Sequence, residues 1–322
     1  MAVSTTPEQR ESVLDITVQS STNLNLYLVA KTYQPALFYV VDIFSLVIAL
    51  LGLLGNSIIL WLLGFRIQRS PFSVYILNLA TADALLLGSS FVLCMWHIVG
   101  DLNNTVQVLV SHIGHLSYCV GLSLLAAIST ERCLSVLFPI WYRCHRPKHM
   151  SMAVCTALWA LPCLPWGAAV ALHFHQEDWV LYYVLDYVEF GWFVLLTCVL
   201  CVSSLTLVLR VQCSSQHRRP PRLYLLILLT VLVFLLCGLP WGMVNVILWP
   251  HPFSLVPLGL LRLLACVNSS ANPFIYFFLG SQWHRRGREP LRVVLQRALG
   301  EEQEEGVGSR DTSHPNTLDK LS

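Results

Sequence analysis

Residues 121–147 read GLSLLAAISTERCLSVLFPIWYRCHRP, an apolar run that carries two adjacent charges, Glu131 and Arg132, and then continues into a basic, proline-containing segment. Apolar runs of this kind, separated by short polar breaks, recur along the sequence. The chain has 322 residues, of which 55% are hydrophobic and 12% are charged. Soluble domains carry roughly twice that charged fraction, so most of the surface is expected to face lipid.

Seven apolar runs are long enough to cross a bilayer as helices, since a hydrocarbon core of about 30 Å needs about 20 apolar residues. In hydrocarbon every backbone donor and acceptor needs an internal partner, so such runs form helices. The sequence therefore predicts an all-α membrane protein with a seven-transmembrane helix bundle over residues 36–280. The runs lie at about 36–64, 72–98, 107–138, 150–173, 179–212, 222–249 and 254–279.

The orientation of the bundle follows from basic residues in its short loops. Arg66 and Arg69 follow the first run, and three basic residues lie at 143–148 after the third. The loops after the second and fourth runs carry acids and neither lysine nor arginine. The odd loops are therefore expected in the cytoplasm of a multi-pass plasma-membrane protein, with the N-terminal tail, residues 1–35, outside and the C-terminus inside.

The segment after the last run predicts a short amphipathic helix. Within residues 281–300, Leu291, Val294 and Leu295 share one helical stripe with arginines around it. That pattern is typical of a helix lying on the inner membrane surface. Residues 301–322 are acidic and polar and are expected to be a disordered cytoplasmic tail.

A buried acid lies in the second run, where Asp83 occurs in LNLATADALLL. An ionisable residue within a span is costly and suggests a function. Asn56 in the first run, and Asn268 and Ser269 in the seventh, can reach the same depth, so these four residues are predicted to form an intramembrane polar network. It could admit a water molecule or a sodium ion, or Asp83 could be a structural hydrogen-bond node.

Two prolines predict movable inner halves of the sixth and seventh helices. Pro240 in FLLCGLPWG and Pro273 in NSSANPFIYF each remove one backbone hydrogen bond and disfavour a straight helix. The inner half of the last helix could then swivel and carry Tyr276, which follows Asn272 and Pro273. Either proline alone could be an ordinary kink of a membrane helix.

The charged pair of the opening stretch falls at the cytoplasmic end of the third run. A snorkelling anchor would explain Arg132 alone, but not the adjacent acid. We therefore interpret Glu131 as a carboxylate that holds Arg132 until helices separate, which makes the pair a switch.

These motifs, in this order, resemble those of the rhodopsin-like (class A) G protein-coupled receptors and, within them, the Mas-related receptors. The resemblance covers roughly residues 52–300 and is carried by WLLGFRIQRSPFSVYILNLATAD, GLSLLAAISTERCLSVLFPIWYRCHRP, LTVLVFLLCGLP, NSSANPFIYFFLGS and PLRVVLQRALG. It implies a receptor, not an enzyme, that signals through heterotrimeric G proteins and binds arrestin, in sensory neurons or immune cells. It assigns activation and G protein coupling to Glu131, Arg132, Pro240, Asn272, Pro273 and Tyr276. No cofactor, metal or nucleic acid is implied.

Several positions depart from the usual class A pattern. Gly121 replaces a serine of the sodium site, Gly238 replaces the toggle tryptophan, and Gly114 occupies the position of the amine-binding aspartate. Gln107 replaces the cysteine at the top of the third run, so the usual extracellular disulfide is not expected. The aspartate's absence argues against an ordinary monoamine receptor.

The segment between the fourth and fifth runs predicts a binding site for a cationic ligand, either a peptide or a small molecule. Asp186 and Glu189 are three residues apart and share a helix face, and Trp192 can add a cation–π contact. Asp186 also resembles an acid used for basic ligands in some Mas-related receptors, although Ala169 replaces its expected partner. Alternatively, the acids merely mark a loop outside the cytoplasm. The acids of this segment are Glu177, Asp178, Asp186 and Glu189.

Other assignments remain open at this point. Asn103 begins the sequon Asn-Asn-Thr in a loop predicted outside and is a candidate glycosylation site. His112 and His115 share a helix face and are interpreted as interfacial histidines, with a zinc site as the alternative. A seven-helix transporter or channel with Asp83 in its conduction path is the main rival function, although no internal repeat supports it.

Overall fold

The computed structural model describes residues 38–67, 70–100, 103–147, 149–175, 179–213, 222–243, 258–281 and 290–298, and these residues form helices and no strand. The predicted all-helical fold is confirmed. The first helix spans Phe38–Arg66 and ends in the π-helix η1 (Leu62–Arg66). It is followed by the long helices α2 (Pro71–Val99), α3 (Asn104–Leu137), α5 (Met150–His175) and α6 (Trp179–Cys213). The next span is a continuous segment made of α7 (Arg222–Val233), η2 (Phe234–Gly238) and α8 (Leu239–Met243), and the last long helix is α9 (Leu258–Ser281). The short helices are α4 (Pro139–Cys144) and α10 (Leu291–Ala298).

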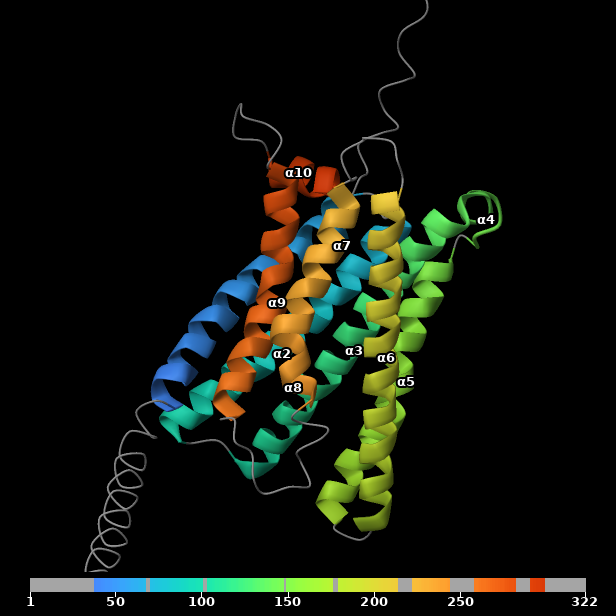
Figure 1. The fold of residues 1–322 in the computed structure, drawn as a ribbon. Coiled ribbons are helices and arrows are strands. Elements are labelled where there is room, and N and C mark those ends of the chain that lie inside the picture. Colours follow the sequence, from blue (N-terminus) through green and yellow to red (C-terminus); the bar gives the residue numbers. More distant parts are fainter. Residues whose placement is uncertain are drawn as a thin grey trace, which may run out of the picture.

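The long helices form one bundle, and α4 and α10 lie at the same end of it (Figure 1). We call this the α4 end. Six of the described helices are long and apolar enough to span a membrane. The seventh, α9, is not among these six, and its run includes Arg262 and the polar residues at 268–272. It nevertheless packs against α2 and α7 and completes the bundle.

Local signals in the sequence explain where α2 begins and ends and where α3 begins. Ser70 caps α2 by accepting a hydrogen bond from the Ser73 backbone N–H at 3.1 Å, and Pro71 occupies the first helical turn. Gly100 ends α2 in the left-handed conformation, with φ of 82°, which a glycine adopts without steric cost. Asn103 then caps α3 through its side-chain oxygen. Capping residues therefore set both ends of α2 and the start of α3.

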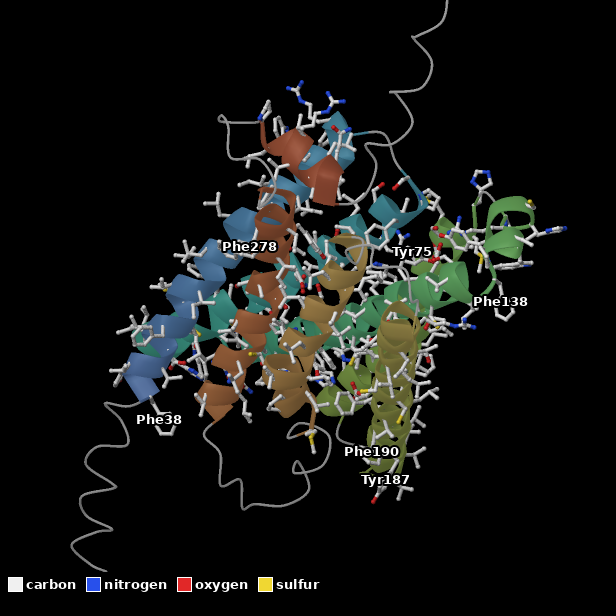
Figure 2. The ribbon with its side chains drawn as sticks, turned by 45° about the horizontal axis from the view of Figure 1, so that its top comes forward. Phe38, Tyr75, Phe138, Tyr187, Phe190 and Phe278 are labelled. Carbon is white, nitrogen blue, oxygen red and sulfur yellow. The ribbon has the colours of Figure 1, made fainter. Side chains whose placement is uncertain are left out.

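Large apolar side chains face both the core and the surroundings. Tyr75 and Leu124 are almost fully buried, whereas Phe38, Phe138 and Tyr187 are 38%, 55% and 73% exposed and lie at the periphery in Figure 2. Such a surface is unfavourable in water and suits a lipid environment. The apolar exterior is thus consistent with the membrane location expected from composition.

The first helix packs closely against α9. A Cβ atom at Gly52 would lie 2.1 Å from Ser270 Oγ, and one at Gly55 would lie 3.0 Å from the Pro273 side chain. The Ser270 hydroxyl also donates to the Ile48 carbonyl at 3.1 Å. The absence of a side chain at Gly52 therefore permits a close approach of these two helices beside the proline of α9.

The sixth predicted span is distorted just before Pro240. Residues Phe234–Gly238 form the π-helix η2, and the helix then continues as α8. The Tyr118 hydroxyl of α3 donates to the Gly238 carbonyl at 3.0 Å, so an outside partner satisfies a backbone group in this distorted turn. The irregular turn lies where the sequence predicted a weak point.

The helix predicted after the last span is α10, which lies across the α4 end (Figure 1). Val294 and Leu295 are buried, at 8% and 0% exposure, and Leu295 belongs to the main hydrophobic core, whereas Leu291 is exposed. The apolar stripe therefore covers the end of the bundle. The predicted tails, residues 1–35 and 301–322, lie outside the described residues.

Candidate functional site

A polar cluster joins the first helix, α2 and α9 inside the bundle. The Asn272 amide donates to the Asp83 carboxyl at 2.7 Å, and the Ser269 side chain is a second partner of Asp83. The Asn56 amide donates to the Ser269 carbonyl at 3.2 Å and to the Gly52 carbonyl at 3.0 Å. Asn56 and Asp83 are 1% and 4% exposed. Three of the four residues predicted for this network, and Asn272, therefore lie together.

Asn268, the fourth predicted member, faces a different element. Its side chain lies 3.2 Å from the position that a Cβ atom would take at Gly238 in η2. Asn268 thus lies against the distorted turn that precedes Pro240. Tyr276, one turn beyond Pro273, is 2% exposed and packs in the main hydrophobic core. These residues place polar or aromatic groups beside both proline-containing helices.

At the α4 end, the Glu131 carboxylate binds groups from outside its own helix. It forms an ion pair with Arg146 and accepts a hydrogen bond from the Tyr142 hydroxyl at 2.8 Å. The guanidinium of Arg146 also donates to the Ser151 hydroxyl at the start of α5. The side chains of Glu131 and Arg146 are 12% and 7% exposed. These contacts hold α4 and its flanking residues against the end of α3.

The sequence predicts that Glu131 holds Arg132, whereas the contacts just described connect its carboxylate to Arg146 and Tyr142. Consecutive residues of a helix do not face each other, so a carboxylate reaches residues from a neighbouring element more readily than its own successor. The guanidinium of Arg132 lies 3.9 Å from the centre of the Phe72 ring of α2. Arg146 is one of the three basic residues at 143–148 that indicate the orientation of the bundle, and the sequence does not predict its pairing with Glu131.

A second cluster lies in the opposite half of the bundle, between α3 and α6. Nε2 of His115 contacts the Glu189 carboxylate, and the Cys119 sulfur lies 3.4 Å from that carboxylate oxygen and 3.7 Å from the His115 nitrogen. His115 and Cys119 are one helical turn apart on α3. Glu189, predicted as a ligand-binding acid, therefore already has two partners within the bundle.

The other predicted ligand-binding residues differ in what the structure describes. Trp192 is partly buried and packs against the main hydrophobic core. Asp186 lies on α6, but its side chain is outside the described part. His112, which the sequence grouped with His115, packs edge-on against Trp166 of α5 with ring centres 5.1 Å apart.

A third cluster connects the first helix, α2 and α9 at the end opposite α4, and its cation, Arg262, is not among the residues predicted from the sequence. The Asp42 carboxylate lies 3.4 Å from His97 Nδ1 and 3.9 Å from an Arg262 nitrogen. Arg262 also lies 3.2 Å from His97, and the Cys94 thiol is 3.8 Å from Asp42. A lone arginine in the apolar run LGLLRLLAC was a signal for such a partner, since intramembrane charges pair.

Two of the glycine departures, Gly114 and Gly121, differ in the space beside them. A Cβ atom at Gly114 would lie 2.5 Å from the Ser89 hydroxyl oxygen, so an aspartate could not be accommodated there without movement of Ser89. A Cβ atom at Gly121 would meet nothing within 4 Å, which leaves open space beside that position. The ten cysteines whose side chains the structure describes are all free thiols. Among them Cys198 and Cys201, three residues apart on α6, are exposed.

Comparison with known proteins gives one consistent result. The sequence model of the family "7 transmembrane receptor (rhodopsin family)" matches residues 55–276. The chain is 45% identical over 277 residues to the Mas-related G-protein coupled receptor member X1 of Homo sapiens, covering 83% of this chain and 85% of that receptor. It is 46% identical over 276 residues to member X2 of Macaca mulatta (79% and 81% covered) and 43% identical over 288 residues to member D of Macaca fascicularis (84% and 88% covered).

Proposed function

Because the chain belongs to the rhodopsin family of seven-transmembrane receptors and, within it, to the Mas-related G protein-coupled receptors, we propose that ligand binding controls G protein coupling through the Glu131–Arg146 contact. As a member of this family the protein is a membrane receptor and not an enzyme, with an extracellular ligand and a G protein as its partners. The rival assignment as a transporter or channel with Asp83 in a conduction path is not supported.

The observation that carries the proposal is the set of partners of the Glu131 carboxylate. Tyr142 contacts the carboxylate from α4, and Arg146 contacts it from the segment just after α4. Since the carboxylate and the guanidinium are largely buried, they stabilise each other strongly only while α4 stays against α3. Separation of these elements releases the pair and changes the surroundings of Arg132, the next residue on α3. We assign contact with the G protein to Arg132.

Movement inside the bundle reaches the α4 end through the two proline-containing helices. We assign movable joints to Pro240, which follows the π-helix η2, and to Pro273 in α9. The buried bond between Asn272 and Asp83 lies next to Pro273 and holds α9 to α2. Rotation of the part of α9 that follows Pro273 would move the Tyr276 side chain. In this scheme the residues that resemble the class A switch motifs act as one connected unit.

We propose a cationic peptide or small molecule as the activating ligand. The support is the acidic sequence that runs from the end of α5 into the first turns of α6, where Asp186 precedes Trp192 by six residues and four acids occur without a basic residue. Glu189 already contacts His115, so Asp186 is the better candidate for a direct ion pair with the ligand. Gly114 stands where monoamine receptors have an amine-binding aspartate, and Ser89 occupies the space that such a side chain would need.

The remaining parts of the proposal concern location and further partners. We propose a plasma-membrane receptor with its N-terminus outside and its α4 end in the cytoplasm, in contact with arrestin as well as the G protein. The basic residues at 143–148 and the position of α4 and α10 at one end support this orientation. Expression in sensory neurons or immune cells rests on the family resemblance alone.

The switch is tested by basal G protein activation in transfected cells, normalised to receptor at the cell surface. Glu131→Gln and Arg146→Gln each remove one partner, so each should raise basal signalling, and a shift of ~1 kcal/mol would change the active fraction about fivefold. The double variant should signal no more than the stronger single variant, because both changes break the same contact. Arg132→Ala should lower coupling at normal surface expression.

Two results would contradict this switch. One is unchanged basal signalling in both Glu131→Gln and Arg146→Gln. The other is full coupling by Arg132→Ala. Either result would leave Glu131 and Arg146 as a structural clamp between α3 and α4. Tyr142→Phe removes the neutral hydrogen bond and keeps the ion pair, so it should raise basal signalling less than either charge change.

A further inference from the structure

The three side chains of His115, Cys119 and Glu189 form the donor set of a metal site. The three ligand atoms, an imidazole nitrogen, a sulfur and a carboxylate oxygen, all lie within 4.8 Å of one another. Zinc is bound in proteins by this combination of nitrogen, sulfur and oxygen ligands. We propose that this cluster binds Zn²⁺ between α3 and α6, independently of the activating ligand proposed above.

Two of the three distances within the cluster fit a tetrahedral zinc ion. With zinc–ligand bonds of about 2.0–2.3 Å, tetrahedral angles separate neighbouring ligand atoms by about 3.3–3.7 Å. The Cys119 sulfur already lies 3.4 Å from the Glu189 oxygen and 3.7 Å from the His115 nitrogen. The remaining pair, His115 and Glu189, is in direct hydrogen-bond contact and has to open slightly so that the metal can take the place of the shared proton.

The charges of the cluster also suit a divalent cation. A Cys119 thiolate and a Glu189 carboxylate each carry one negative charge and a neutral His115 carries none, so Zn²⁺ completes a neutral set. A neutral set avoids the cost of an unpaired charge within the bundle. Binding releases the thiol proton and the proton shared by His115 and Glu189, as metal binding to such ligands does. No oxidation or reduction is involved.

The positions of the ligands give the site a framework and an open side. His115 and Cys119 are one turn apart on α3 and project from one face of that helix, and Glu189 faces them from α6. The side chains of His115 and Glu189 remain 21% and 32% exposed. Three protein ligands leave a fourth tetrahedral position for water or for a donor group of another molecule. The bound metal would tether α3 to α6 in the half of the bundle away from α4.

The test uses the purified full-length receptor in lipid nanodiscs and Zn²⁺ itself as the probe, titrated against a fluorescent chelator. We expect one equivalent of zinc per receptor, bound at micromolar or lower concentration. His115→Ala, Cys119→Ser and Glu189→Gln should each weaken binding at least about tenfold, since even loss of a residue that only supports a ligand costs that much. Cys163 and His97 lie outside the cluster, so the Cys163→Ser and His97→Ala variants should bind zinc as tightly as the unmodified receptor.

A spectroscopic measurement on the unmodified receptor keeps the test independent of how well the variants fold. Co²⁺ added in place of zinc should give a thiolate-to-metal charge-transfer band, which Cys119→Ser should abolish. The proposal is overturned if the folded receptor takes up no stoichiometric zinc, if Cys119→Ser retains full affinity, or if Co²⁺ gives no thiolate band. These measurements need no G protein, so they remain interpretable if the proposed switch fails.

Discussion

The side-chain amide of Asn272 donates a 2.7 Å hydrogen bond to the carboxyl of Asp83, which joins α9 to α2 across 189 residues of chain. Both side chains are almost fully buried, at 3% and 4% exposure. A buried polar group without a partner is costly, so each residue depends on the other. The bond therefore fixes α9 beside Pro273, which has no backbone N–H to donate within the helix.

Asp83→Leu should destabilise the receptor because it leaves the Asn272 amide without its acceptor. We expect a cost of about 1–3 kcal/mol and a lower apparent melting temperature in detergent. Asp83→Asn retains an acceptor oxygen and should unfold closer to the unmodified receptor. Equal melting temperatures for the leucine and asparagine variants would show that this hydrogen bond does not stabilise the contact between α2 and α9.

Gly52→Val should disrupt the packing of the first helix on α9. Its Cβ atom would lie 2.1 Å from Ser270 Oγ, and overpacking of this kind costs about 1–3 kcal/mol. Gly88→Ala is the matched control, because a Cβ atom at Gly88 meets nothing within 4 Å and alanine favours a helix. Surface expression and melting temperature should fall for Gly52→Val and be kept or improved for Gly88→Ala. Loss in both variants would point to a general intolerance of added side chains.

The two possible roles of Asn103 can be separated by a pair of variants. Its side-chain oxygen accepts the Thr105 backbone N–H at 3.0 Å and caps α3, while its side-chain nitrogen is the atom that a glycan would modify. Thr105→Val removes the sequon and keeps the cap, whereas Asn103→Gln removes both.

Glycosidase treatment should therefore increase the gel mobility of the unmodified receptor and of neither variant. Asn103→Gln should in addition lose about 1 kcal/mol of stability, measured as a lower melting temperature than that of Thr105→Val. A glycosidase-sensitive Thr105→Val receptor would place the glycan elsewhere. An insensitive unmodified receptor would remove this support for the orientation proposed for the second loop.

Asp186→Asn should weaken the response to a cationic activating ligand. Loss of one charge pair is expected to raise the half-maximal concentration roughly tenfold, equivalent to about 1.4 kcal/mol. The measurement is a calcium or cyclic-AMP dose response at matched surface expression. Asp178→Asn is the charge-matched control in the same acidic segment and should shift the response less. An unchanged dose response for Asp186→Asn would exclude a direct contact between Asp186 and the ligand.

The amino-acid sequence by itself determined the all-helical fold and the approximate positions of the long apolar helices. Length and hydropathy are properties of local sequence, and hydrocarbon leaves helices as the means of satisfying the backbone. Capping residues such as Ser70 and Gly100 set helix ends for the same local reason. Asn56, Asp83 and Ser269 could be grouped in advance because each is a polar residue at a comparable depth in an apolar run.

The tertiary structure decided which partner each polar residue has. Glu131 contacts Arg146 and Tyr142, and Glu189 contacts His115 and Cys119. Arg262 contacts Asp42 and His97. None of these pairings was predicted from the sequence. A partner on another helix depends on how far each helix is rotated about its axis and where the helices cross. Those quantities arise from the packing of side chains over the whole bundle, and a local pattern of residues does not contain them.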